Sequence, residues 1–444
     1  MKKLKITFIG AGSTIFAKNV LGDCIQTKVL EDAEYALFDI DEVRLNESKM
    51  ILDSINKNFK TKAVIKTYLD RREALKGAKY VVNAIQVGGY DPCTIQDFEI
   101  PKKYGLRQTI ADTIGIGGTF RALRTLPVLE SIARDMEEVC PDAIFINYTN
   151  PMSILTGYMN RFTNIKTIGL CHSVQVAIPE LFKDLKIDID PESVRSRFGG
   201  INHMNFLLDV KDEAGTDLYP LIKKKAFKYL NDKNSYKNYE HPDLVRFKMM
   251  EAFGHYITES SEHAAEYYPY FIKPTHKEII DEYRVPLDEY PRRCIDQIKN
   301  WEDMREELLK DNDIKHENSR EYVSGIIGAI EGNSSFEFYG NVINEGTISN
   351  LPTEACVEVR CIANKDGVHK TVLGRVPVQC AALNMKHINV HNLVIEAYTK
   401  RSKEALYHSV LLDPLASSVL GIDEIKSMVD ELLDAQKDWH VEYN

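Results

Sequence analysis

The sequence predicts an α/β fold on three observations near its start. The compact apolar run from Leu4 to Ile9 is typical of a buried parallel strand. The turn Gly10-Ala11-Gly12-Ser13 follows it directly, and residues 14–30 have the pattern of a helix. A second strand, residues 35–38, then ends at Asp39. This order of elements forms a βαβ unit, so we expect an N-terminal dinucleotide-binding domain of the Rossmann type.

The glycine turn and Asp39 are the candidate contacts of the dinucleotide. Backbone N–H groups at the start of a helix bind a pyrophosphate, so Gly10, Gly12 and Ser13 are predicted to hold it. A carboxylate at the end of the second strand accepts hydrogen bonds from the ribose and repels a 2′-phosphate, which favours NAD over NADP. The fingerprint is incomplete, because Ile15 replaces the third glycine and Asp39 comes later than the usual spacing of about 20 residues. A tight turn without a ligand is therefore the alternative.

The alternation of strands and helices continues through the first half of the chain. Residues 80–85, 143–147 and 166–170 are predicted strands. Loops that follow parallel strands gather at one edge of the sheet, where ligands bind. The polar residues at or just after these strand ends are therefore expected to converge, and they are Asn83, Asn147, Asn150 and Cys171.

The pattern changes beyond about residue 195. Helical patterns dominate residues 221–311, short strands are expected near 356–362, and the apolar residues between 422 and 433 share one helical face. No linker rich in Gly and Ser separates the halves. We predict a dinucleotide-binding domain over residues 1–195 and a mixed α+β domain, for substrate binding and oligomerisation, over residues 196–444.

Composition narrows the class of protein. The 444 residues include 56 Lys and Arg against 66 Asp and Glu, a formal net charge of −10. This balance argues against a nucleic-acid partner or an anionic membrane surface. No apolar run reaches the roughly 18–20 residues of a membrane span, and the eight cysteines form no CxxC pair. We therefore expect a cytoplasmic protein with free thiols.

Three segments carry residue types suited to catalysis. A thiolate from Cys171 and an imidazole from His203 can hold a transition metal with positions left open, although an apolar cysteine and a satisfied histidine are the commoner reading. Residues 112–121 form a glycine-dense loop suited to close approach of a ligand, or a plain surface loop. Residues 266–270 combine an acidic residue with tyrosines, which are either packing residues or, beside a cation, a general base.

Taken together, these residues resemble the NAD-dependent family 4 glycoside hydrolases, and within them the α-galactosidase branch. The motifs that carry the resemblance cover essentially the whole chain. They are Gly10-Ala11-Gly12-Ser13, Asp112-Thr113-Ile114-Gly115, Asn147-Tyr148-Thr149-Asn150-Pro151, Cys171-His172-Ser173-Val174-Gln175, Gly200-Ile201-Asn202-His203-Met204, Thr258-Glu259-Ser260-Ser261-Glu262-His263, Pro286-Leu287-Asp288-Glu289-Tyr290-Pro291 and Gly421-Ile422-Asp423-Glu424-Ile425.

The resemblance implies an unusual hydrolysis in which NAD+ is a true cofactor, outside the usual two-carboxylate mechanism. NAD+ takes a hydride from C3 of the sugar, and a divalent metal, usually Mn2+, stabilises the charge that develops next. A base then removes the C2 proton and the C1–O bond breaks by elimination. Water adds to the unsaturated intermediate, and the hydride returns to C3. The fold implied is that of lactate and malate dehydrogenases.

The resemblance also implies roles for individual residues. Cys171 and His203 match the metal ligands. The tyrosine base falls at Tyr267, with Tyr268 as a rival, because differences in chain length blur the register. His172 stands where phospho-sugar members have an aspartate, so it either protonates the leaving group or contacts a sugar hydroxyl. Asn150 is expected to bind substrate hydroxyls.

Asn83 and Asn147 are expected along the nicotinamide side. The tetrapeptide Cys171-His172-Ser173-Val174 resembles the α-galactosidase version, so the substrate implied is a small α-galactoside such as melibiose. An α-glucosidase or α-galacturonidase of the same family is the alternative. An ordinary lactate- or malate-type dehydrogenase, or a non-catalytic NAD sensor, would belong to another class. Relatives of this kind are homodimers or homotetramers.

Overall fold

The computed structural model describes residues 3–310 and 314–444. All its strands join in one sheet with the order β3-β2-β1-β4-β5-β6-β9-β10-β7-β8, and β11 pairs with β10. The strands are β1 (Lys5–Ile9), β2 (Glu34–Phe38), β3 (Val64–Tyr68), β4 (Tyr80–Asn83), β5 (Ile144–Asn147), β6 (Thr167–Gly169), β7 (Arg195–Ile201), β8 (Met204–Lys211), β9 (Phe336–Ile343), β10 (Cys356–Asn364) and β11 (Gly367–Lys370).

The first six strands are parallel and follow the order of a Rossmann fold. The predicted strands at residues 4–9, 35–38, 80–85, 143–147 and 166–170 are confirmed, with ends that move by one or two residues. All five residues of β1 are buried, as expected for a strand covered on both faces. β3 was not predicted from sequence, because it lies at the sheet edge and its Lys66 is exposed.

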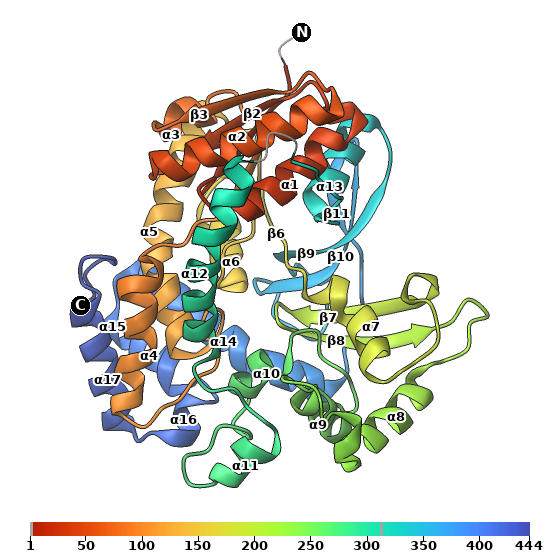
Figure 1. Cartoon of the computed structure of the whole chain (residues 1–444). Coiled ribbons are helices and arrows are strands. Elements are labelled where there is room, and N and C mark those ends of the chain that lie inside the picture. Colours follow the sequence, from red (N-terminus) through yellow and green to blue (C-terminus); the bar gives the residue numbers. More distant parts are fainter. Residues whose placement is uncertain (1–2, 311–313) are drawn as a thin grey trace.

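Helices connect the strands and cover the sheet (Figure 1). The predicted helix over residues 14–30 ends at Gln26 and is followed by a short 3-10 turn. The helices are α1 (Thr14–Gln26), α2 (Glu42–Phe59), α3 (Arg71–Leu75), α4 (Ile95–Lys103), α5 (Gly115–Val139), α6 (Met152–Phe162), α7 (Ser173–Asp184), α8 (Tyr219–Asn231), α9 (Leu244–Phe253), α10 (Ser261–Tyr267), α11 (Lys277–Glu282), α12 (Glu289–Lys310), α13 (Tyr322–Gly332), α14 (Val378–Lys400), α15 (Lys403–Leu411), α16 (Ala416–Val419) and α17 (Ile422–Ala435).

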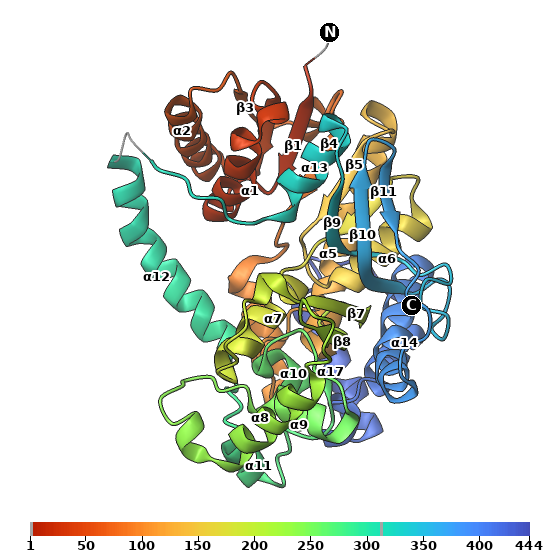
Figure 2. The ribbon, with the colours of Figure 1, turned by 90° about the vertical axis from the view of Figure 1, so that its right-hand side faces the viewer.

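The second half of the chain continues the same sheet with antiparallel strands. β9 pairs with β6 at Gly169 and Asn341, so the sheet crosses the predicted boundary at residue 195, which stays a prediction. α13 packs on α1 and on β10. α12 extends toward the nucleotide-binding half and contacts α2 (Figure 2). The second half is therefore packed against the first, and the mixed α+β expectation is confirmed.

Two further features match the composition. The eight cysteines all lie within the described residues and are free. Among the helices of the described residues, none combines the length and the apolar character that a bilayer crossing requires.

Candidate active site

The carboxyl ends of the parallel strands open into a cleft of about 1090 Å³. This size suits a dinucleotide together with a sugar, since drug-sized ligands occupy pockets of roughly 300–1,000 Å³. Most of the predicted site residues line it, from the glycine turn at one end to the histidines at the other. These residues are Gly10, Gly12, Ser13, Asp39, Asn150, Cys171, His172 and His203.

The nucleotide end of the cleft is built by the glycine turn. Gly10 has a φ of 87°, and a Cβ atom there would lie 2.4 Å from the Ala84 carbonyl oxygen, so only glycine fits. The Gly12 amide donates a hydrogen bond of 2.6 Å to Asp39 Oδ2. Ile15 is 36 % exposed, so its side chain needs no close approach to the sheet. This explains how the turn forms without the third glycine.

Asn83 and Asn147 lie behind the cleft and do not line it. Both are buried, and Asn83 Nδ2 donates to Asn147 Oδ1 at 2.9 Å and to Thr149 Oγ1 at 3.0 Å. Thr149 does line the cleft. The two amides therefore hold the loop that borders the cleft, and any contact of theirs with a dinucleotide would pass through that loop.

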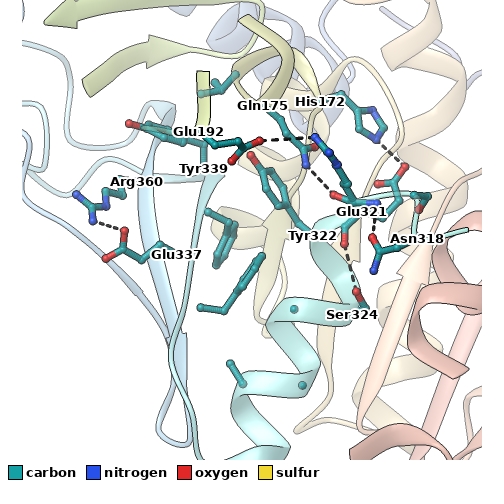
Figure 3. Close-up of a pocket in the computed structure, with 18 of the residues that line it drawn as sticks. His172, Gln175, Glu192, Asn318, Glu321, Tyr322, Ser324, Glu337, Tyr339 and Arg360 are labelled. Atoms are coloured by element: carbon teal, nitrogen blue, oxygen red, sulfur yellow. Dashed lines mark hydrogen bonds and ion pairs between the residues drawn. The ribbon is translucent and has the colours of Figure 1, made fainter. Parts of the chain in front are cut away.

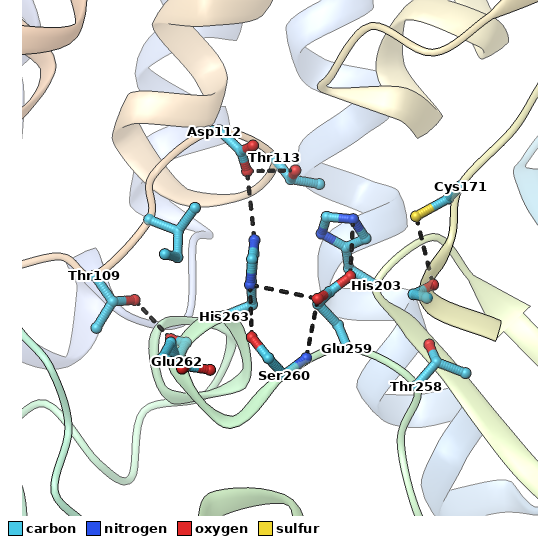
Figure 4. Close-up of polar contacts among 12 residues, drawn as sticks. Thr109, Asp112, Thr113, Cys171, His203, Thr258, Glu259, Ser260, Glu262 and His263 are labelled. Carbon is cyan, nitrogen blue, oxygen red and sulfur yellow. Dashed lines mark hydrogen bonds and ion pairs between the residues drawn. The ribbon is translucent and has the colours of Figure 1, made fainter. Parts of the chain in front are cut away.

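The metal end of the cleft contains two overlapping groups of ligating atoms (Figure 4). Atoms of Cys171, His203 and Glu259 lie within 4.8 Å of one another, and so do atoms of Asp112, His203 and His263. Sulfur, imidazole and carboxylate donors together suit a divalent transition metal. Glu259, Asp112 and His263 were not assigned from sequence, although the motifs at residues 112–115 and 258–263 contain them.

His203 is shared by both groups. Its Nε2 atom is 3.2 Å from Glu259 Oε2, and its Nδ1 atom is 2.8 Å from the Tyr267 hydroxyl oxygen. Burial disfavours charge on His203, but the Glu259 carboxylate and the Cys171 side chain raise its pKa to about 10. The local field therefore favours positive charge at this point, as a cation site requires.

Asp112 and Asn150 line the cleft beside His263. Asn150 Nδ2 donates to Asp112 Oδ2 at 3.2 Å, and His263 Nε2 lies 3.9 Å from Asp112 Oδ1. Burial raises the pKa of Asp112, but His263 and Arg121 outweigh this and lower it. Asp112 is therefore ionised beside Asn150, and the pair presents hydrogen-bonding groups to the cleft.

Tyr267, rather than its neighbour Tyr268, contacts the histidine. Tyr267 is fully buried and does not line the cleft, whereas Glu259 does. Burial and the nearby Glu266 carboxylate raise the pKa of Tyr267 well above its usual range. The Tyr268 hydroxyl has no partner within the described residues, and its ring stacks on Tyr270. The structure thus separates the two tyrosines and adds Glu259 as a carboxylate that faces the cleft.

His172 is held by a residue that the sequence did not indicate. Its Nε2 atom is 2.6 Å from Glu321 Oε1 (Figure 3). The Tyr148 hydroxyl donates to Glu321 Oε2 at 3.0 Å. The hydrogen bond to Glu321 raises the pKa of His172. Asp23 in turn anchors this segment, because it accepts hydrogen bonds from the Ser319 and Glu321 amides. His172 also borders a second, more open cleft of about 1540 Å³.

Comparison with known proteins identifies the family. Residues 5–187 match the model of family 4 glycosyl hydrolases, and residues 198–416 match the model of their C-terminal domain. The chain belongs to the family 4 glycosyl hydrolases. The resemblance stated from sequence is thereby confirmed.

Relatives within family 4 differ in their similarity to this chain. It is 56% identical to the alpha-galactosidase of Bacillus subtilis, over 99% of both chains. It is 29% identical to an alpha-galacturonidase of Thermoanaerobacter italicus, over 98% of this chain and 97% of that one. It is 30% identical to an alpha-glucosidase of Erwinia rhapontici, over 98% of both.

Solved structures support the fold. A 6-phospho-alpha-glucosidase from gut microorganisms, in complex with NAD and Mn2+, superposes with a TM-score of 0.78 at 21% identity over 100% of both chains. The lactate dehydrogenase of Cryptosporidium parvum gives a TM-score of 0.54 at 14% identity, over 89% of this chain and 99% of that one. The predicted likeness to lactate and malate dehydrogenases is confirmed at the level of the fold.

Proposed function

We propose that this family 4 chain is an α-galactosidase that hydrolyses small α-galactosides such as melibiose, with NAD+ and a divalent metal, Mn2+, as cofactors. The 56% identity to the Bacillus subtilis alpha-galactosidase supports the substrate class. The complex of a structural relative with NAD and Mn2+ supports the cofactors. The observation that carries the proposal is the convergence of Cys171, His203 and Glu259 in the same cleft as the glycine turn.

The residues present fit both cofactors. When bound, NAD+ takes and returns a hydride at C3 of the sugar, while the metal acts as a Lewis acid toward the sugar oxygens. The turn at Gly10, Gly12 and Ser13 lines the cleft and lets the pyrophosphate approach the start of α1, which would hold it, while Asp39 would hold the ribose. Cys171 and His203 would hold the metal, with Glu259 as a third group within reach.

Proton transfers then fall to side chains near the sugar. His172, held by Glu321, donates a proton to the leaving oxygen as the C1–O bond breaks. A base removes the C2 proton, and here two groups compete. Tyr267 is the residue that the resemblance implies, and Glu259 is the carboxylate that lines the cleft. Asn150 orients a sugar hydroxyl.

Turnover of melibiose in D2O tests the reaction. With NAD+, Mn2+ and a thiol reductant present, we expect deuterium at C2 of the released galactose, because the base exchanges its proton with solvent before water adds. Galactose released without deuterium would mean direct displacement at C1 or a base that returns the same proton without exchange, and the assignment of the base would then need independent support. If melibiose is not cleaved while an α-glucoside or α-galacturonide is, the substrate class is wrong and the family mechanism still stands.

The two candidate bases are separated by paired substitutions. Tyr267→Phe removes only the hydroxyl that contacts His203, and Glu259→Gln removes only the charge beside it. The substitution of the true base is expected to abolish C2 deuterium incorporation, since no other group takes the proton. Tyr268→Phe is the matched control and is expected to leave incorporation unchanged.

A dehydrogenase of the lactate or malate type is the second candidate, favoured only by the shared fold. It predicts net formation of NADH with a hydroxy acid and no metal requirement, and it leaves the cluster around His203 without a role. The homodimer or homotetramer and the cytoplasmic location expected from sequence also stay proposals. Sedimentation of the purified chain tests the first of these.

A further inference from the structure

A buried carboxylate lies in the sheet between the two strands that lead to Cys171 and His203. Glu358 on β10 is fully buried and is paired in register with Asn341 on β9 and Gly200 on β7. The same row continues to Gly169 on β6 and to Asn205 on β8. Cys171 follows Gly169 by two residues, and His203 precedes Asn205 by two. Glu358 therefore lies at the middle of a row that joins both predicted metal ligands.

Three asparagines donate to this carboxylate. Glu358 Oε1 accepts from Asn341 Nδ2 at 3.1 Å and from Asn202 Nδ2 at 3.4 Å, and Oε2 accepts from Asn205 Nδ2 at 3.1 Å. Asn341 Nδ2 also lies 3.4 Å from the Gly169 carbonyl oxygen. All three amides are buried. The contacts extend from β10 to the end of β6 and to both sides of His203.

The Glu358 carboxylate forms no ion pair within the described residues: burial raises its pKa, and nearby His203 opposes that shift without overcoming it. Its donors are neutral amides, and within residues 3–310 and 314–444 no lysine, arginine or histidine forms an ion pair with it; His203 pairs with Glu259 instead. A buried charge is costly unless it is compensated. A divalent cation at Cys171 and His203 would add positive charge near this carboxylate and so favour its ionised form.

The turn that carries His203 also needs support. Asn202 and His203 form the two-residue turn of the β7–β8 hairpin, and His203 has a φ of 62°. A residue other than glycine is rarely found in this left-handed region, and it stays there only where its surroundings hold it. The hydrogen bonds of Glu358 to Asn202 and Asn205 provide that hold on either side of the turn.

We propose that Glu358 is a positioning residue of the metal site. It fixes the His203 turn through Asn202 and Asn205, it fixes the strand before Cys171 through Asn341, and its charge strengthens cation binding. The inference rests on the proposed function only in taking Cys171 and His203 as metal ligands.

The variant Glu358→Gln separates the charge from the packing. Asn202, Asn205 and Asn341 each have an Oδ1 atom without a partner, so any of these amides can turn to accept from the new NH2 group. The network then keeps its shape without its charge. Asp413→Asn is a matched control, because Asp413 is also a buried carboxylate but it accepts hydrogen bonds from the Leu415 and Ala416 amides.

Calorimetric titration of the purified full-length chain with Mn2+, without sugar, is the test. We expect the Mn2+ dissociation constant of Glu358→Gln to rise about 10- to 100-fold, with NAD+ affinity unchanged and the melting temperature of the metal-free protein equal to or above that of the wild type, because the variant lacks the buried charge. Saturating Mn2+ is expected to restore melibiose turnover, which a purely structural defect would not allow. Asp413→Asn should bind Mn2+ like the wild type.

Two results would overturn the inference in distinguishable ways. If the wild type binds Mn2+ tightly and Glu358→Gln binds it equally well, Glu358 has no part in the site, and the proposed function is unaffected. If the wild type itself binds no Mn2+, the proposed metal site fails and this inference fails with it.

Discussion

The two ends of the active-site cleft are built in opposite ways. The nucleotide end comes from a single stretch of chain, in which the turn at residues 10–13 meets Asp39 across two neighbouring parallel strands. The metal end comes from segments around residues 112, 171, 203 and 259–267, which are distant in sequence. A local turn can be read from neighbouring residues, whereas a cluster of distant side chains exists only after the chain has closed around it.

The metal end should be sensitive to single ligands. Cys171→Ser and His203→Ala are expected to lower kcat by at least about 1000-fold, since Lewis-acid stabilisation is worth several kcal/mol. NAD+ affinity should stay within about twofold of the wild type, because these substitutions do not change the residues at the nucleotide end of the cleft. Melibiose turnover and NAD+ titration of the same preparations measure both quantities.

Cys140→Ser, which changes a buried free cysteine outside the cleft, is the control for these variants. Substantial turnover by Cys171→Ser at ordinary Mn2+ concentrations would rule out Cys171 as a required ligand. A parallel loss of NAD+ binding would instead mean that the two ends are coupled.

Substitutions at the nucleotide end should have a smaller effect than those at the metal end, and they should act on NAD+ binding alone. Asp39→Ser removes a charged acceptor, so NAD+ affinity is expected to fall about 10- to 100-fold and discrimination against NADP+ to narrow. Trp439 lines the cleft and is one of 2 tryptophans in the chain, so quenching of its fluorescence can report binding.

Mn2+ affinity of Asp39→Ser should not change. Asp53→Ser, at an exposed position of α2, is the control and should bind NAD+ normally. Wild-type NAD+ affinity in Asp39→Ser would show that the ribose is held by other groups.

The pH profile tests His172, which lines the same cleft. Glu321 raises the pKa of His172, so the protonated acid persists to higher pH in the wild type. Glu321→Gln removes that charge, and the alkaline limb of kcat/KM is expected to move to lower pH, while turnover below the limb changes only a few-fold.

The control for this profile is Glu317→Gln, which changes an exposed residue of the same segment and should leave the limb in place. An unmoved limb in Glu321→Gln would mean that another group protonates the leaving oxygen.

Sequence patterns predicted the strands that consist of short, uninterrupted runs of buried apolar residues. β1, β2, β4 and β5 are short apolar runs, and each was found at its expected place. The hairpin of β7 and β8 was not predicted, because it begins with the polar run Arg195-Ser196-Arg197, whose Arg195 and Arg197 are exposed. The role of Glu358 was not predicted either, because the residues next to it in sequence do not indicate which groups its carboxylate will contact.

The sequence by itself determined the turn at Gly10, the acidic strand end at Asp39 and the parallel order that carries them, because each follows from backbone geometry within about forty residues. The tertiary structure alone decided that Glu259 faces His203, that Glu321 holds His172 and that Glu358 joins the strands next to Cys171 and His203, the two proposed metal ligands. The contacts of Glu259 with His203, of Glu321 with His172 and of Glu358 with Asn202 link residues 56, 149 and 156 positions apart in the chain. Local propensities do not encode them, and they form only when segments distant in the chain pack together.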